Sequence, residues 1–306
     1  MNLLGEPVRR REDERILRGH ARYLDDLELP RMAHAAFVRS PHARADIVSV
    51  SPPARAPGLL GALTALDVAG RARPFAVPRI EDARLAGVPH PILAEDQVRY
   101  AGQPVAVVIA ESRAQAEDAA ELVEVGYEPH DAVVDPRGAP EELMRWRRVV
   151  GDVDGAFAGA AHVVRGRYAL PRLVATPMET RGVIAVYGER DDLLTVWGSF
   201  QDPHRPRAQL AHALDREPDR IRVIVPDVGG AFGSKGVLPV EGVAVALAAI
   251  ELGRPVKWAE DRMENFVGAY QGRGVRADVE LALDAEGRIL AVRADILADL
   301  GAFLLP

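Results

Sequence analysis

Cysteine is absent from all 306 residues of the chain. Its absence excludes disulfide bonds, thiolate metal ligands and any iron–sulfur cluster held by this chain. It also fits a reducing compartment, so we expect a cytoplasmic protein. No run approaches the roughly 20 apolar residues that cross a bilayer, and residues 1–18 carry charges instead of the apolar core of a secretion signal. Neither a membrane span nor a signal peptide is predicted.

Excess positive charge and metal-ligand spacing are lacking as well. The net charge is −7 with acidic and basic residues mixed along the chain, which argues against nucleic acid as a partner. Acidic residues interrupt the basic stretch at 9–18, so we interpret it as a solvated face. The eight histidines show no metal-binding spacing, and His204 and His212 are too far apart on a helix to pair. We predict no metal ligands in this chain.

The first half of the sequence predicts several strands. An apolar fraction of 48% is typical of soluble globular proteins, and the length allows two domains. Strands are expected at 32–38, 47–50 and 59–65, with Thr64 capping a short helix that follows. Residues 71–93 are rich in proline and arginine, which indicates a long surface connection.

The clearest local unit begins at residue 104. Residues 104–110 are almost wholly apolar, which predicts a strand buried on both faces. Ser112 and Gln115 form a capping box that starts a helix, and residues 124–128 resume extended structure. This order predicts a β-α-β unit. Proline-rich sequence then indicates a linker over residues 136–150.

The second half alternates strand and helix patterns. Their expected ranges are strands at 161–170, 182–187, 193–200, 221–226 and 256–262, helices at 203–214 and 239–252, and a hairpin of 276–283 with 289–298. The last residues, 298–306, lie inside apolar sequence. We expect them to pack against another surface or to continue on another polypeptide.

A glycine-rich loop at residues 227–236 joins the strand at 221–226 to the following helix. A strand, a glycine loop and a helix present bare backbone N–H groups to an anion, and the helix start adds partial positive charge. The loop is not a P-loop, because Ser234 precedes Lys235, and its glycine spacing does not fit the dinucleotide fingerprint. An anion-cradling loop and a purely steric tight turn both remain open from the spacing.

Several further motifs occur in one order along the chain. They are Glu12-Asp13-Glu14-Arg15, Gly19, Tyr23-Leu24-Asp25-Asp26, residues 37–43, residues 99–106, residues 151–154, Pro177-Met178-Glu179, residues 201–204, residues 228–235 and residues 258–262. Together they resemble the large, molybdopterin-binding subunit of the molybdenum hydroxylases. That family includes xanthine dehydrogenase, aldehyde oxidase and aerobic carbon monoxide dehydrogenase. The resemblance covers essentially the whole chain.

The resemblance implies a mixed α/β (α+β) fold. Residues 1–135 would form an α/β hammerhead domain, residues 136–150 a linker, and residues 151–306 the first part of a molybdopterin-binding domain. It also implies a molybdenum–molybdopterin cofactor, which in bacterial members is often the cytosine dinucleotide form.

The same resemblance implies the residues of a cofactor site. They are Gln201, Gly229, Gly230, Ala231, Phe232 and Gly233. The loop residues would pass the cofactor with backbone amides, and the side-chain amide of Gln201 would face an oxygen ligand as a neutral donor. Lys235 would either balance cofactor charge, form a salt bridge or lie on the surface.

The sequence departs from the family pattern in two respects. Ala231 stands where the family usually has a third glycine, so its methyl group either hinders a close approach or is tolerated at negative φ. The family's large subunit is also much longer, and its catalytic glutamate lies in the part that this chain lacks. We therefore predict no catalytic residue here, and Glu179, Glu241 and Glu260 receive no catalytic role.

Two hypotheses follow. In the first, the chain is the N-terminal part of a split or truncated subunit of a molybdenum-dependent oxidoreductase, and it is inactive alone. It would share its cofactor with a second polypeptide and assemble with flavin and iron–sulfur subunits. In the alternative, it is a non-catalytic binding or assembly module, or a remnant of that family. An independent nucleotide-binding enzyme is disfavoured, because the phosphate fingerprints fail.

Overall fold

A seven-stranded mixed sheet forms the centre of the computed structural model, which describes residues 4–77, 84–139 and 142–304. In spatial order its strands are β12 (Ile221–Ile224), β11 (Leu193–Gly198), β10 (Gly182–Gly188), β13 (Val256–Ala259), β1 (Ala33–Arg39), β6 (Pro104–Ala110) and β3 (Leu59–Thr64). Strand β1 pairs in parallel with β13 and antiparallel with β6. Strands from both sides of the predicted linker therefore share one sheet.

Two helices pack on this sheet where the sequence predicts them. Helix α6 (Val240–Leu252) packs on β10 and β13 and is apolar nearly all round, which matches its complete burial from residue 240 to 249. Helix α3 (Arg113–Glu121) packs on β1 and β6, and Ser112 accepts a hydrogen bond from the Gln115 amide at 3.3 Å. Every residue of β6 is buried, as its apolar run predicts.

Helix α5 (His204–Ala213) confirms the helix expected at 203–214 and packs next to β12. The shorter helices are α1 (Asp13–Leu17), α2 (Ala65–Val68), α4 (Val153–Ala158), α7 (Arg262–Gly268) and the 3₁₀ turns η1 (Leu24–Asp26), η2 (Pro136–Gly138) and η3 (Pro218–Arg220). Thr64 begins α2 as predicted, because the Asp67 carboxylate accepts its backbone N–H at 2.8 Å. None of the described helices combines the length and apolar character that crossing a bilayer requires.

The prediction of a β-α-β unit is wrong in its pairing. The strand, helix and second strand all form, but β6 lies between β1 and β3 with antiparallel pairing to both. Strand β7 (Glu124–Pro129) instead pairs with β2 (Ala45–Ser51) in a separate sheet completed by β5 (Gln97–Val98). An apolar run indicates that a strand is buried on both faces. It does not indicate whether the neighbouring strands run parallel or antiparallel to it.

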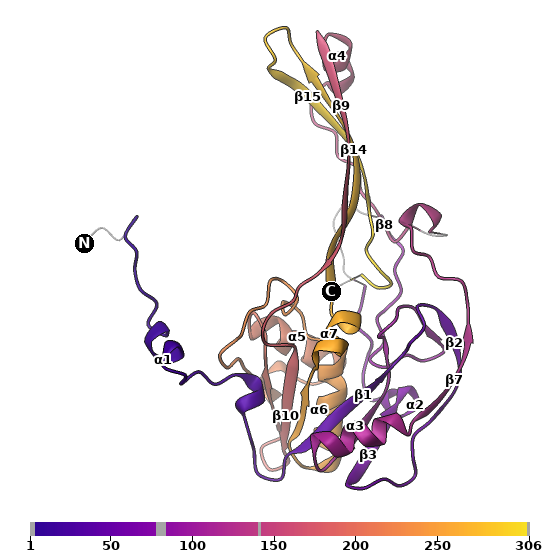
Figure 1. The fold of residues 1–306 in the computed structure, drawn as a ribbon, viewed down its shortest axis with the longest axis vertical. Helices are drawn as coiled ribbons and strands as arrows, with labels where there is room; N and C mark the ends of the chain where they lie inside the picture. The colour runs from indigo at the N-terminus through magenta and orange to yellow at the C-terminus, as the bar shows by residue number, and fades with distance from the viewer. Residues whose placement is uncertain (1–3, 78–83, 140–141, 305–306) are drawn as a thin grey trace.

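A third sheet projects away from the base of the molecule. Figure 1 shows β9 (His162–Val174), β14 (Gln271–Leu283) and β15 (Ile289–Ala298) as a long ribbon with α4 at its tip. All three strands are antiparallel, and β14 lies in the middle. The predicted hairpin of β14 and β15 is confirmed. A short pair, β4 (Arg84–Leu85) with β8 (Met144–Arg145), completes the strands of the described residues.

Two other expectations need correction. The prediction of a surface connection at 71–93 is wrong near both ends of this stretch. Phe75 and His90 pair there as a buried β-bridge, and Leu93 is also buried. Residues 78–83 of that stretch lie outside the described residues. The strand expected at 256–262 stops at Ala259. Asp261 then caps α7 through a capping box with Glu264, a signal that the sequence contains.

The described end of the chain packs against the first half of the sequence. Phe303 is buried and stacks on His90 with ring centroids 4.1 Å apart, and Tyr100 meets it edge-on. Residues 305–306 lie outside the described residues. One of the two expectations for the apolar segment, packing against another surface, therefore holds for Phe303.

Candidate functional site

The glycine loop, residues 227–236, leaves β12 and turns before α6. Gly230, Phe232 and Gly233 have positive φ values of 95°, 51° and 93°. Within the described residues, the amide N–H groups at positions 230–233 have no acceptor, and the Phe232 ring is 79% exposed. A left-handed conformation at a bulky residue such as Phe232 is uncommon. The loop thus presents a row of free main-chain donors.

Gln201 lies beside this loop. Its backbone N–H donates to the Lys235 carbonyl at 3.0 Å, and a Cβ placed on Gly236 would lie 3.7 Å from Gln201 Oε1. The residue is exposed, and its side-chain amide has no partner among the described residues. The fold therefore brings Gln201, which follows β11, next to the loop that follows β12.

The backbone accommodates Ala231 without strain. Its φ lies outside the left-handed region, and its carbonyl accepts hydrogen bonds from the Ser234 amide at 3.0 Å and the Ser234 hydroxyl at 2.8 Å. The methyl group replaces no glycine that the turn needs for its backbone angles. Of the two outcomes expected at this position, the loop conformation fits the tolerated one.

Glu179 holds the loop from beneath. Its Oε2 accepts from the Gly229 amide at 2.8 Å, the Ser199 hydroxyl at 2.6 Å and Lys235 Nζ at 2.9 Å. Its Oε1 accepts from the Leu24 amide at 3.2 Å. The amide of Gly229 is thus engaged, unlike its four successors. One carboxylate fixes the start of the loop, its lysine and the end of β11 in a single arrangement.

Lys235 is buried and forms the salt bridge that was one of its three expected roles. Burial lowers the pKa of Lys235, while the carboxylate of Glu179 opposes that shift. The side chain points into the protein, so the open side of the loop carries main-chain donors and no charged group from this lysine. Sequence reasoning missed the Glu179–Lys235 pair, although both residues stand in the family-like motifs.

The N-terminal segment is tied to the first residue of the loop. Arg15 binds the Asp227 carboxylate with both terminal nitrogens at 2.6 Å, and the Arg22 amide donates to the same carboxylate at 2.8 Å. These donors lower the pKa of Asp227 to about 2, with the Arg15 hydrogen bond as the main cause. Arg15 is itself exposed, as the interpretation of residues 9–18 as a solvated face predicts, and it reaches Asp227 from that face.

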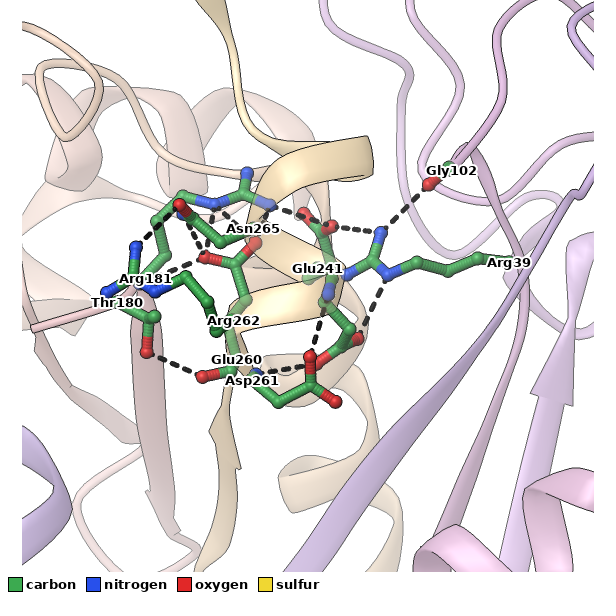
Figure 2. A network of polar contacts seen from close by, with 10 residues as sticks. Arg39, Gly102, Thr180, Arg181, Glu241, Glu260, Asp261, Arg262 and Asn265 are labelled. Carbon is green, nitrogen blue, oxygen red and sulfur yellow. Dashed lines mark hydrogen bonds and ion pairs between the residues drawn. The ribbon is translucent and has the colours of Figure 1, made fainter. Parts of the chain in front are cut away.

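A buried ion network lies behind the site. Figure 2 shows Arg39 and Arg181 on either side of Glu241. Arg39 Nη1 lies 2.8 Å from Glu241 Oε1, and Arg181 Nη2 lies 3.7 Å from the same oxygen. Arg181 also pairs with Glu260, and Arg39 Nε reaches Glu264 at 2.9 Å. Burial opposes ionisation of Glu241, yet the two guanidinium groups hold its pKa below the ordinary value.

This network joins distant parts of the chain, and its members Arg181, Glu241 and Glu260 are buried. Arg39 comes from β1, whereas Glu241 lies in the first turn of α6 and Glu260 follows β13. Asn265 donates to Glu260 at 2.8 Å, and the Gly102 carbonyl accepts from Arg39 at 3.0 Å. The network's position accounts for two of the glutamates that sequence reasoning left without a role.

Other parts of the described chain offer no competing metal centre. No group of three or more histidine, aspartate or glutamate side chains is arranged to hold a metal in residues 4–77, 84–139 and 142–304. A cavity of about 320 Å³ lies between β1, α3 and β13, with His34, Arg113 and Lys257 in its wall. None of the predicted cofactor-site residues lines this cavity.

Each half of the sequence matches a known protein family. The profile of the molybdopterin cofactor-binding domain matches residues 134–305, and that of the a/b hammerhead domain of aldehyde oxidase and xanthine dehydrogenase matches residues 18–131. The nicotine 6-hydroxylase large subunit of Paenarthrobacter nicotinovorans is 39% identical over 100% of this chain and 39% of its own length. The carbon monoxide dehydrogenase large chain of Afipia carboxidovorans is 37% identical over 98% of this chain and 40% of its own.

Solved structures agree with this assignment. Quinoline 2-oxidoreductase from Pseudomonas putida 86 superposes with a TM-score of 0.87 at 38% identity, over 95% of this chain and 39% of that one. The chain spans about two fifths of the length of the curated relatives it matches. A hammerhead domain and a molybdopterin cofactor-binding domain follow one another here as they do in those large subunits. On these grounds the chain belongs to the family of molybdopterin-binding large subunits of the molybdenum hydroxylases.

Proposed function

We propose that this chain is one part of the large subunit of a molybdenum hydroxylase-type oxidoreductase and supplies part of its molybdopterin site. The observation that carries the proposal is a row of amides at positions 230–233 that have no acceptor among the described residues, beside the side-chain amide of Gln201, which has no partner among them either. Free backbone donors in a turn with positive φ values suit an anionic oxygen or phosphate. The chain would bind and orient the cofactor, and it contributes no catalytic residue.

The donor set fits such a group on chemical grounds. The carboxylate of Glu179, which contacts the loop, is engaged by Lys235, Ser199 and Gly229, so its charge is compensated within the protein. A neutral amide such as that of Gln201 holds an anionic oxygen without a competing proton equilibrium. When bound, a molybdenum–pterin supplies two-electron redox chemistry at its metal. The residues of this chain would fix its position and exclude misaligned binding.

We further propose that this part works together with the remainder of a large subunit and with other subunits of a complex. The chain spans about two fifths of the length of its relatives. These residues contain no cysteine, so we assign any iron–sulfur cluster to a partner outside them, and the flavin to a further one. By this proposal the isolated chain is inactive.

Coexpression with the neighbouring reading frames tests the proposal. We expect a complex that contains this chain, bound molybdenum and pterin, measured by elemental analysis and by fluorescence of the released pterin. Gln201→Ala and Gly230→Val should each lower the molybdenum content severalfold, whereas Gln271→Ala, at an exposed residue of β14, should not. A complex that keeps its full cofactor content in both loop-site variants would refute the proposed site.

The form of the cofactor is a separate proposal. We propose the cytosine dinucleotide form, because the resemblance is to bacterial large subunits. Mild acid hydrolysis of the complex should then release cytidine monophosphate in a one-to-one ratio with molybdenum. Release of no nucleotide would favour the plain molybdopterin. A stable monomer that takes up no cofactor and finds no partner would instead favour a non-catalytic module.

A further inference from the structure

Asp227, the first residue of the glycine loop, is held by one short segment near the start of the chain. Its carboxylate accepts both terminal nitrogens of Arg15 at 2.6 Å and the Arg22 amide at 2.8 Å. Its own amide donates to the Arg22 carbonyl at 3.1 Å. A bidentate arginine–carboxylate pair fixes orientation as well as distance. The position of Asp227 is therefore set by residues that lie 212 and 205 positions away along the chain.

The same segment reaches the carboxylate that holds Gly229. The Leu24 amide donates to Glu179 Oε1 at 3.2 Å, and Oε2 of that carboxylate accepts the Gly229 amide at 2.8 Å. The Glu179 amide in turn donates to the Gly229 carbonyl at 3.1 Å. Asp227 and Gly229 are thus held, directly or through Glu179, by residues 15–27, which we call the N-terminal strap.

The far end of the strap is fixed to the central sheet. Leu24 is buried, and it packs so closely on Gly182 of β10 that a Cβ there would lie 2.3 Å from Leu24 Cδ2. Lys257 of β13 donates to the carbonyls of Asp25 and Leu27 at 2.6 and 3.4 Å, and its Nζ lies 2.8 Å from the Asp25 carboxylate. A segment fixed to a rigid sheet at one end can hold a loop in one place at the other.

The open donors of the loop need such support from both sides. The amides at positions 230–233 have no acceptor among the described residues. Gly230 and Gly233 lie among them, and glycine adopts many backbone conformations, so the donors keep one arrangement only while the flanking residues are held. On the downstream side Lys235 is buried and paired with Glu179. On the upstream side the support comes from the strap.

We propose that Arg15 is a positioning residue of the cofactor site, which acts through Asp227 to keep the loop amides aimed at an anionic oxygen or phosphate of the bound group. This inference rests on the function proposed above. Arg15 is exposed, and exposed ion pairs contribute little to global stability, so its loss should loosen the loop while the fold persists. A preorganised donor set binds more tightly than a mobile one, because less conformational freedom is lost on binding.

Hydrogen exchange measures the support without the cofactor. The chain is coexpressed with the neighbouring reading frames in a host that cannot synthesise molybdopterin. In Arg15→Ala we expect the amides of residues 228–233 to exchange at least about tenfold faster than in the wild type, with unchanged exchange in β6. Arg18→Ala is the matched control, because Arg18 lies in the same segment and pairs with Glu14 at 2.7 Å instead of with the loop. Unchanged exchange in the loop, or an equal acceleration in β6, would overturn the positioning role.

Molybdenum content measures the consequence for the cofactor. In the complex from a host that makes the cofactor, Arg15→Ala and Asp227→Asn should each lower the molybdenum-to-protein ratio about threefold or more, whereas Arg18→Ala should match the wild type. The double variant of Arg15 and Asp227 should lose no more than either single variant, because both changes remove the same pair. Losses that multiply in the double variant would show that Arg15 does not act through Asp227. Circular dichroism checks the fold of each variant.

The outcomes separate the strap from the proposed function. A wild-type complex without bound molybdenum would refute the proposed function and, with it, this inference. If the wild type is loaded and Arg15→Ala keeps the wild-type molybdenum content, with or without faster loop exchange, the role of Arg15 is wrong while the proposed function stands.

Discussion

Lys235 and Glu179 form an ion pair of 2.9 Å beneath the glycine loop, with the lysine side chain wholly buried. Because the carboxylate also accepts the Gly229 amide and the Ser199 hydroxyl, this pair fixes both ends of the loop against β11. The open donors at positions 230–233 thus rest on a buried charge pair. Their arrangement is preorganised before any ligand arrives, which lowers the cost of binding.

Removal of the carboxylate should destabilise the protein strongly. Glu179→Gln leaves the buried ammonium of Lys235 without its counter-charge, and breaking such a pair costs roughly 3 kcal/mol. Urea unfolding at pH 7 measures the change. The double variant Glu179→Gln with Lys235→Met should recover part of the loss, because no uncompensated charge remains. Wild-type stability in the single variant would show that the pair contributes little.

Two glycines of the loop should differ sharply in their tolerance of alanine. A Cβ on Gly229 would lie 2.5 Å from Glu179 Cβ, whereas one on Gly236 meets only atoms at 3.4 Å or beyond. We expect Gly229→Ala to lower the free energy of unfolding by roughly 1–3 kcal/mol through forced displacement, and Gly236→Ala by less than about 1. Urea denaturation of both variants provides the comparison. A larger effect at Gly236 would contradict the described loop packing.

The buried ion network should tolerate the loss of its shared carboxylate poorly. In Glu241→Gln, Arg39 and Arg181 both lose a counter-charge in a fully buried setting, and we expect a loss of roughly 3–5 kcal/mol. A double-mutant cycle of Arg39→Met with Glu264→Gln then measures one arm of the network alone. Coupling indistinguishable from zero would mean that Arg39 contributes through packing against Trp258 rather than through charge.

Local sequence patterns predict the type of most elements, helix or strand. The buried run of β6, the Ser112 cap and the hairpin of β14 and β15 each depend on residues close in sequence, so their patterns predict them. Local patterns do not predict the strands with which β6 and β7 pair, because pairing depends on which distant strand has a complementary face. That choice is made by packing across the whole sheet, and an apolar run is equally compatible with either orientation.

The same distinction between local and distant residues applies to the candidate site. The glycine loop was visible in the sequence, and the resemblance added Gln201, which the fold brings beside it. The supports of the loop were not foreseen, because Glu179 and Arg15 lie about 50 and 212 residues away from their partners along the chain. A local sequence pattern does not contain such contacts, because they form only when distant segments meet in the fold.

The clamp between Arg15 and Asp227 should weaken in acid. The folded pKa of Asp227 is about 2, below the ordinary carboxyl value, so its contribution to stability is complete above about pH 4 and is lost as the pH falls towards 2. Asp227→Asn should therefore be less stable than the wild type at pH 7, with a difference that shrinks between pH 4 and pH 3. Urea midpoints over that range measure it. A difference independent of pH would exclude the ion pair as its source.

His90 should make the protein acid-sensitive at a higher pH. Its ring is buried against Phe303, and its Nε2 has no partner in the described structure. Burial lowers the pKa of His90 to about 4. Between pH 6.5 and 4 the unfolded chain binds a proton at this residue that the folded chain does not. Stability should therefore rise with pH across this window, by up to about 1.4 kcal/mol per unit.

Replacement of the imidazole isolates that contribution. His90→Phe keeps an aromatic ring for stacking on Phe303 and removes the titrating group, so its unfolding free energy should depend less on pH between 4 and 6.5. The exposed His204, changed to Phe in the same way, is the control for the loss of a histidine as such. Urea unfolding at half-unit pH steps compares the three slopes. Equal slopes in the wild type and His90→Phe would mean that the buried imidazole binds its proton equally well in both states, and the stacked, desolvated ring would then be an incorrect description of residue 90.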